Sequence, residues 1–480
     1  MLTRADFAAI APILIVTLSA CFVLVAEAIR RRGEWMPHGA LGVIGLGGAI
    51  VTSALQWDQQ HIGFGVIIAD NYALFFNIAI CGMGVLTILL SSGTAVRDRL
   101  PEGEYYALVL FSTAGMMMMG STRDLLVVFI ALEIMSLGVY ILTAIKRTSL
   151  AGAEAGFKYF VLGGFSSAFF VYGIALVYAV TGTTRLDDLG RMVATQSLDP
   201  NVLLVLAMIF LIVGFAFKVS AVPFHMWAPD AYQGAPTLVT GFMSTAVKAA
   251  AFAAFARVFL SALEPLRAEW VPILTAIAGL TMILGTVVGV AQTSVKRMLA
   301  YSSIAHAGYV LVALVAANAT GKAAILFYLV AYAVTNLGAF GVLAALATND
   351  RPHDDVRDFA GLGRERPGLA AVLTVFLLSL GGFPPTVGFV AKWYVFSAAV
   401  QANLIALAVL GVLTSVVAVF FYLRIVVMMY MAPERAPNHR PAVPAVALAG
   451  LLVALVVVFY LGVLPGRLLA LAADSVAAIF

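Results

Sequence analysis

The chain has 480 residues, of which 62% are hydrophobic and 11% charged, with a net charge of +4. Soluble domains contain about 45–50% apolar and about 25% charged residues, so lipid must be the solvent for much of this surface. The two cysteines, Cys21 and Cys81, are too few for a disulfide framework or a thiolate-held cluster, and neither a Walker loop nor a dinucleotide fingerprint is present. Redox chemistry and ATP hydrolysis are therefore not expected in this chain.

Apolar runs long enough to cross a bilayer, about 20 residues each, follow one another along the chain. The first ends before Arg30-Arg31-Arg32 and is expected to be a retained helix, not a cleaved signal peptide. The seventh and twelfth runs are too long for one straight span, and each contains two prolines, so both are predicted to be broken. The fourteen predicted helices lie at 7–29, 39–56, 70–91, 105–121, 124–145, 155–180, 201–234, 236–260, 271–293, 298–317, 321–347, 368–400, 403–430 and 441–464.

The loops between these helices are short, and their basic residues indicate an orientation. With the N-terminus outside, 15 of the 28 Lys and Arg residues fall in inside loops and 8, including Arg257, in outside ends and loops. The remaining five fall within spans. This bias predicts that both termini lie outside. The longest polar stretch, 348–367, is expected to be a solvated inside loop.

The two broken helices indicate an internal symmetry. The first break lies between Lys218 and His225, and the second between Gly381 and Gly388, shortly before Lys392. Because they are five helices apart, an odd offset, they predict two five-helix repeats of opposite topology, at 105–260 and 261–430. Helices 1–3 would occupy 1–104, and helix 14 would lie in 431–480. Interrupted helices in corresponding positions are typical of an ion path in a transporter, although either break alone is also compatible with an incidental proline kink.

Four charged residues lie well inside apolar runs: Glu133, Lys218, Lys248 and Lys392. A charge at the bilayer centre costs about 2.5–3.5 kcal/mol, so such residues need a partner or a function. A desolvated lysine can change protonation state near neutral pH, and a neighbouring carboxylate restores its charged form. We predict a proton relay through these four residues, with Glu133 beside Lys218. The structural alternative is a static ion pair, with the other lysines bound to carbonyls freed at the breaks.

Weaker candidates have stronger structural alternatives. Glu154 and Lys158 have the spacing of a helical ion pair and are also placed to extend toward the interface. His225 and His306 have the chemistry of proton shuttles, but a lone membrane histidine is more often a hydrogen-bonded core residue. Arg424 is expected to extend toward the inner interface. Residues 116–119 are four consecutive methionines, whose side chains would point in four different directions on a helix and could not converge on one ion. They are therefore expected to pack in the core, and no metal site is predicted there.

Three segments resemble a known family, the antiporter-like subunits of respiratory complex I. They are FKVSAVPFHMWAPDAYQGAP at 217–236, KRMLAYSSIAHAGY at 296–309, and FKYFVLGGFSS at 157–167 with YGIAL at 172–176. The third is similar to the N subunit in particular, and the resemblance covers nearly the whole chain. Lys392, where one larger homologue has a glutamate, and an end at Phe480 without a long lateral helix also fit the N subunit.

The resemblance implies an all-α membrane protein with fourteen core helices and inverted repeats. It implies a place in the membrane arm of a proton-pumping NADH:quinone oxidoreductase in a bacterial inner membrane. Other membrane-arm subunits would be its partners, and NADH, flavin, iron–sulfur clusters and quinone would be bound in partner subunits, with no cofactor in this chain and no nucleic acid. The buried ionisable residues of the family match Glu133, Lys218, Lys248 and Lys392.

Two other functions stay open at this point. A cation/proton antiporter subunit of the related multisubunit type would need a carboxylate-rich cation site near the midplane, where only Glu133 clearly lies. A non-transporting assembly scaffold would use the buried charges for structure alone.

Overall fold

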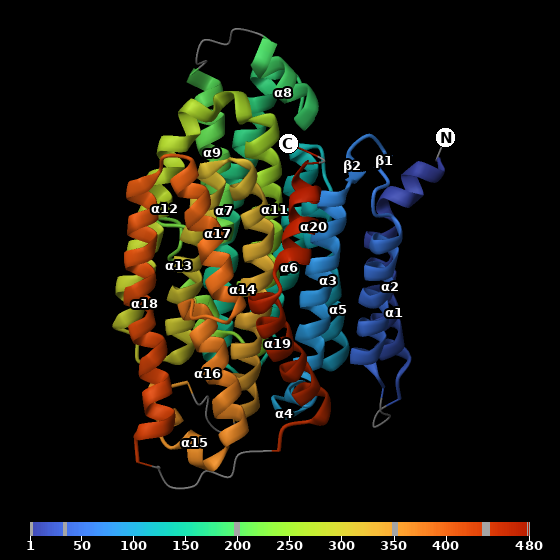
Figure 1. Ribbon diagram of the computed structural model, residues 1–480. Coiled ribbons are helices and arrows are strands. Elements are labelled where there is room, and N and C mark those ends of the chain that lie inside the picture. Colours follow the sequence, from blue (N-terminus) through green and yellow to red (C-terminus); the bar gives the residue numbers. More distant parts are fainter. Residues whose placement is uncertain are drawn as a thin grey trace.

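The computed structural model describes residues 3–31, 36–195, 202–347, 354–433, 442–477 and 479, and within them the chain is a bundle of long helices (Figure 1). The helices are α1 Arg4–Ile29, α2 His38–Leu55, α3 Asn71–Ser91, α4 Thr94–Arg97, α5 Glu102–Gly120, α6 Leu125–Thr143, α7 Leu150–Thr181, α8 Leu186–Thr195, α9 Val202–Val219, α10 Trp227–Gly234, α11 Thr237–Arg257, η1 Val258–Ala262, η2 Glu264–Leu266, α12 Arg267–Val290, α13 Val295–Ala316, α14 Ala319–Leu346, η3 Val356–Phe359, α15 Leu362–Glu365, α16 Pro367–Gly381, α17 Val387–Gln401, α18 Ile405–Met431, α19 Ala445–Val463 and α20 Gly466–Ala477. One small hairpin pairs β1 (His61–Gly63) with β2 (Ile67–Ala69) in antiparallel fashion.

Twelve helical segments of the described residues are long and apolar enough to cross a membrane. The prediction of an all-α, multi-pass membrane protein is therefore confirmed. The predicted ranges 105–121 and 368–400 are helical but do not meet this criterion as single helices. In the first, α5 opens with Glu102 and Glu104, which lower its hydropathy. The second is divided into α16 and α17, each 15 residues long.

Both interruptions predicted from proline are present. In the first, α9 ends at Val219, and the indole of Trp227 donates a hydrogen bond to the carbonyl of Phe217 at 3.0 Å. In the second, α16 ends at Gly381, and Gly382 has a φ of +89°, a left-handed conformation that favours glycine. Each break therefore frees backbone carbonyls inside the bundle, where they need donors from elsewhere in the protein.

The centre of the bundle is formed by α11, α13 and α14, whose apolar segments are almost completely buried. A helix that is apolar on all sides is normally surrounded by other helices, and α11 contacts α3, α5, α9 and α14. Alanines at 249–251, 253 and 254 let these neighbours approach closely. Polar residues on α11 and α13 consequently lie in the protein interior, away from lipid.

Some arginines lie differently from the expectation. Arg257, counted with the outside ends and loops, is buried in the last turn of α11, where its guanidinium forms a bidentate ion pair with Asp70 at 2.8 and 2.9 Å. Arg424 donates to the carbonyl of Val290, the last residue of α12, and to that of Gln292 just beyond it, instead of extending freely to the interface. Of the predictions on loops, Arg32, Arg351, Arg435 and Arg440, with residues 348–353 of the long polar stretch, lie outside the described residues.

Candidate functional site

Lys218 lies in the last turn of α9 and is buried. Its Nζ donates hydrogen bonds to the hydroxyls of Ser136 at 2.7 Å and Tyr140 at 3.1 Å, both on α6. The ring centroids of Tyr140, Phe217 and Tyr159 lie 5.2, 5.6 and 5.8 Å from the same nitrogen. Hydroxyl oxygens and aromatic faces both attract an ammonium group, and no carboxylate of the described residues contacts this nitrogen.

Glu133 lies on α6, one turn before Ser136, and is half-buried. Its carboxylate accepts a hydrogen bond from the hydroxyl of Ser167 on α7. No ion pair joins Glu133 to Lys218 among the described residues, so the expectation of direct contact was wrong. Lys218 instead bonds Ser136, which lies three residues after Glu133 on α6. The sequence analysis missed this serine, although Glu133, Ser136 and Tyr140 form a polar i, i+3, i+7 stripe on an otherwise apolar helix, which is a readable signal.

Lys248 is buried at the middle of α11. Its Nζ donates to the backbone carbonyl of Ser303 at 2.7 Å and to the hydroxyl of the same residue at 2.6 Å. The described part of the chain places no carboxylate within ion-pair distance of it. This second lysine is therefore also held by neutral oxygens.

His306 continues the polar row one turn further along α13. Its Nδ1 lies 2.6 Å from the hydroxyl of Tyr328, and its Nε2 lies 3.3 Å from that of Tyr422, which also contacts Ser302. A neutral imidazole donates at one nitrogen and accepts at the other. With a hydroxyl at each nitrogen, His306 has the geometry to receive a proton on one side and release one on the other.

Lys392 lies on α17 beside the second break and is buried. Its Nζ donates to the carbonyls of Leu380 and Gly381, each at 2.9 Å, and to the hydroxyl of Ser415 at 2.7 Å. The ring of Tyr309 lies 5.3 Å away. Lys392 therefore satisfies the carbonyls freed where α16 ends, as the structural alternative expected, and at the same time places an ammonium group inside the bundle.

Several buried polar atoms around these residues lack a hydrogen bond of good geometry within the described residues. They are the hydroxyls of Ser220, Tyr232, Thr286 and Tyr332 and the Oδ1 of Asn336. They come from the first break, α10, α12 and α14, elements that surround α11 and α13. An unpaired buried polar atom is costly, and ordered water commonly satisfies such groups. The interior between the lysines is thus polar enough to hold water.

A charged cluster joins α7, α10 and α13 near the ends of these helices. Lys158 bridges Glu154 at 2.7 Å and Asp230 at 3.0 Å, and Arg297 contacts the other oxygen of Asp230 at 2.7 Å. Partial burial raises the pKa of Asp230, but the hydrogen bonds from Arg297 and Lys158 lower it by more. The pKa of Asp230 therefore lies below its ordinary value. The helical pair of Glu154 and Lys158 is present, and the sequence analysis missed its extension to Arg297.

His225 and Lys296 contribute less to this arrangement. His225 is half-buried in the first break, and its Nδ1 has no partner in the described part of the chain. Lys296, counted among the basic residues of the inside loops, is instead buried in the first turn of α13 and donates to the carbonyl of Ala235 at 2.6 Å, where α10 ends. Within the described ranges no group of three or more His, Cys, Asp or Glu side chains is arranged to hold a metal ion.

This fold and this row of buried lysines define a polytopic membrane protein with an ionisable interior. Residues 122–418 match the family model described as NADH:quinone oxidoreductase/Mrp antiporter, transmembrane. The chain therefore belongs to this family.

Curated relatives cover nearly its whole length. It is 43% identical to NADH-quinone oxidoreductase subunit N of Trichlorobacter lovleyi over 93% of this chain and 91% of that protein. It is 42% identical to NADH-quinone oxidoreductase subunit N 1 of Solibacter usitatus over 97% and 96%. These matches support the resemblance to the N subunit that the sequence motifs indicated.

Solved structures agree with this assignment. A chain of respiratory complex I from Thermus thermophilus is 34% identical, with a TM-score of 0.79, over 96% of this chain and 99% of that one. A chain of the archaeal membrane-bound sulfane sulfur reductase is 26% identical, with a TM-score of 0.85, over 99% and 98%. A chain of the Mrp complex from Dietzia, at 20% identity, shares the fold, with a TM-score of 0.84 and coverage of 99% and 98%.

Proposed function

We propose that this chain is the proton-translocating N-type subunit in the membrane arm of an NADH:quinone oxidoreductase. Protons pass along Glu133, Lys218, Lys248 and Lys392. One observation carries the proposal: Lys218, Lys248 and Lys392 are buried, and every polar partner found for them is a neutral hydroxyl or carbonyl oxygen. Burying three cations without counter-ions is costly, and such residues within spans normally serve transport.

The partners of the lysines suit a relay. A hydroxyl accepts a hydrogen bond from an ammonium group and can turn to donate one to a neutral amine. Ser136 therefore stays bonded to Lys218 in either protonation state, and Ser303 does the same for Lys248. A carboxylate in contact would instead hold each lysine in its charged form. This difference favours proton exchange over static ion pairing.

The route proposed from these contacts runs in three steps. Glu133 influences Lys218 through Ser136, which follows it by one turn of α6. Water among the unpaired buried hydroxyls connects Lys218 with Lys248. His306 and Tyr422 then carry the proton from the Ser302–Ser303 region toward Lys392. Glu154 and Lys158, with Asp230, are candidates for collecting protons at the entrance, and His225 is a weaker candidate at the first break.

We further propose fourteen spans in two inverted repeats, with α5–α11 as the first and α12–α18 as the second. Adding α5 and the α16–α17 pair to the twelve clear spans gives fourteen. An even count is supported by the two chain ends, which lie at the same end of the bundle (Figure 1). The bias of basic residues supports an outer, periplasmic position for both ends in a bacterial inner membrane.

Partner subunits complete the activity in this proposal. Other membrane-arm subunits would contact the chain, and NADH, flavin, iron–sulfur clusters and quinone would be bound in partner subunits. Electron transfer there supplies the drive, and this chain contributes proton movement. A cation/proton antiporter is the second candidate within the same family, but its cation site would require carboxylates, and the buried row contains only Glu133.

The test uses the assembled enzyme in sealed vesicles, with Lys218→Ala and Glu133→Ala compared against Lys322→Ala, a lysine at the start of α14 and outside the row. We expect both relay variants to lower NADH-driven proton pumping more than twofold per electron pair, while the control keeps it. Full pumping in both relay variants would refute the relay. Sodium-dependent proton efflux from vesicles that hold this chain alone would favour the antiporter.

A further inference from the structure

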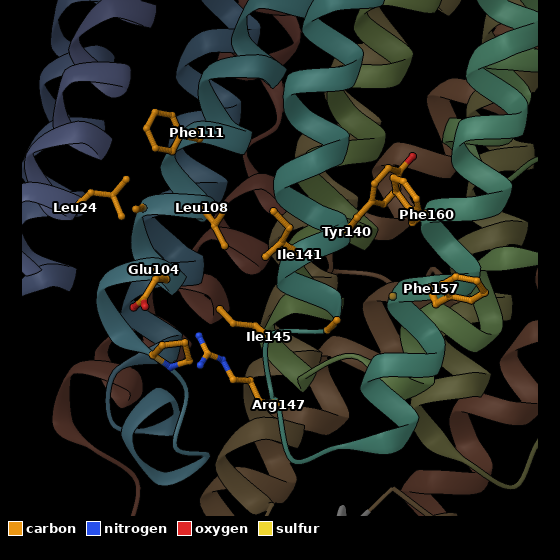
Figure 2. Close-up of a pocket in the computed structure, with 14 residues that line it drawn as sticks. Leu24, Glu104, Leu108, Phe111, Tyr140, Ile141, Ile145, Arg147, Phe157 and Phe160 are labelled. Carbon is orange, nitrogen blue, oxygen red and sulfur yellow. The ribbon is translucent and has the colours of Figure 1, made fainter. Parts of the chain in front are cut away.

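A groove runs along the outside of the bundle between α1, α5, α6 and α7 (Figure 2). It encloses about 570 Å³. Aliphatic and aromatic side chains form its walls, with Leu24, Leu108 and Phe111 on one side and Phe157 and Phe160 on the other. All of these residues belong to α1, α5, α6 and α7, which the proposed topology counts among the membrane spans, so the groove opens toward the apolar part of the bilayer.

A second pocket adjoins the groove at one end and is polar. It encloses about 610 Å³ and shares Pro101, Glu104, Ile145 and Arg147 with the groove. Its charged lining consists of four basic and two acidic side chains: Arg97, Arg99, Lys146, Arg147, Asp98 and Glu104. In Figure 2, Arg147 and Glu104 lie together at this end, below the apolar walls.

Three of the four basic side chains in this pocket have no ion-pair partner among the described residues. Arg97 is occupied by Asp98 at 3.1 Å and by the carbonyl of Ala344. The side chains of Arg99, Lys146 and Arg147 form no hydrogen bond or ion pair with any described part of the chain. Because Asp98 already pairs with Arg97, only Glu104 opposes these three cations, and the pocket has a net attraction for an anion.

We propose that the groove and the adjoining basic pocket together bind one anionic phospholipid. Its phosphate would lie among Arg99, Lys146 and Arg147, and one acyl chain would lie along the apolar walls. A soluble anion would use the basic pocket but leave the groove empty, and a neutral apolar ligand would leave the three cations unpaired. Basic pockets at the ends of membrane helices, next to an apolar groove, match the two parts of such a lipid.

The groove also reaches the proposed relay through one side chain. Tyr140 lines the groove, and its hydroxyl accepts the hydrogen bond from Lys218 at 3.1 Å. A lipid chain in the groove would therefore pack against the ring that supports the first lysine. The lipid site itself does not depend on the proposed function, since it follows from the shape and charge of the surface.

Native mass spectrometry of the full chain tests the proposal. The chain is loaded with phosphatidylglycerol or with phosphatidylcholine of the same acyl chains, and the retained lipid is counted. We expect one phosphatidylglycerol to be retained in preference. Each basic residue near an anionic lipid contributes about 1 kcal/mol, which corresponds to about a fivefold change in affinity. Arg147→Ala should therefore weaken the preference for phosphatidylglycerol about fivefold. The triple change of Arg99, Lys146 and Arg147 to Ala should weaken it more than tenfold. Arg364→Ala, an exposed arginine on α15, is the matched control and should change nothing.

A second variant separates the two halves of the site. Phe157→Ala removes an exposed apolar wall, so it should reduce retention of both lipids by the same factor and leave the preference for phosphatidylglycerol intact. Equal retention of the two lipids by the unaltered chain would overturn the proposal. So would a triple variant that behaves like Arg364→Ala, displacement of the lipid by a long-chain quinone, or a photo-crosslink from position 157 to another subunit in the assembled complex.

Discussion

Ser136 lies one turn after Glu133 on α6 and accepts a hydrogen bond from Lys218, so its removal is a specific test of the proposed coupling between these two residues. In Ser136→Ala, Lys218 keeps the hydroxyl of Tyr140 but loses its 2.7 Å hydrogen bond. A hydrogen bond to a charged group contributes about 1.5–3 kcal/mol. Loss of this bond should therefore weaken the positioning of the Lys218 amine beside α6 and slow proton transfer through it.

The assay is NADH-driven proton pumping in vesicles that hold the assembled enzyme, measured beside NADH oxidation so that coupling is separated from turnover. We expect Ser136→Ala to lower the protons moved per electron pair and Ser136→Thr, which restores a hydroxyl, to recover most of the loss. Ser112→Ala is the matched control, because Ser112 is equally buried and its hydroxyl has no partner among the described residues.

The reasoning would be refuted by unchanged coupling in Ser136→Ala with normal assembly. Loss of coupling in both Ser136→Ala and Ser112→Ala would show that cavity formation is responsible and not the hydroxyl. A loss that threonine does not rescue would point to side-chain shape at this position.

Three further predictions concern stability, measured by thermal unfolding of the full chain in detergent. Arg257→Met should destabilise the protein by about 3–5 kcal/mol because it leaves Asp70 buried without its ion-pair partner. The double variant Arg257→Met with Asp70→Leu should recover much of this loss. Equal destabilisation of the single and double variants would contradict this reasoning. Lys392→Met should cost about 1–3 kcal/mol, since two carbonyls lose their donor, and no change would mean that water replaces the amine. Because the pKa of Asp230 is lowered, its contribution to the free energy of unfolding is present above the unfolded-state pKa of about 3.9 and is lost as pH falls through the lower folded-state pKa. Asp230→Asn should remove this pH dependence of stability. An unchanged dependence of stability on pH in that variant would contradict the assignment.

Local features of the sequence predicted the class of protein and the places of its helices. Hydropathy over about 20 residues is a property of a continuous segment, so no tertiary information was needed to find the apolar runs. The two broken helices followed in the same way, because proline and glycine act on the backbone where they stand. Lys218, Lys248 and Lys392 were found because a charge within an apolar run has no local way to avoid burial.

The partners of those charges were decided only by the tertiary structure. Ser136 lies 82 residues before Lys218, and Ser303 lies 55 residues after Lys248, so no local pattern joins them. The rotation of α6 against α9 turns Ser136, and not Glu133, toward the lysine. Arg257 shows the same limit, because its position at the end of an apolar run resembles that of a loop residue, yet Asp70 lies beside it in the fold.

The apolar groove and its basic pocket depend on tertiary structure even more strongly. Its walls come from four helices, and its basic end combines residues 97–99 with residues 146–147, which the sequence presents only as separate loop charges. Sequence by itself determined which residues must be buried in lipid or protein, because transfer from water depends on each segment's own composition. Which buried groups meet was decided by how the helices pack, because contacts between distant segments depend on helix rotation and depth that composition does not encode.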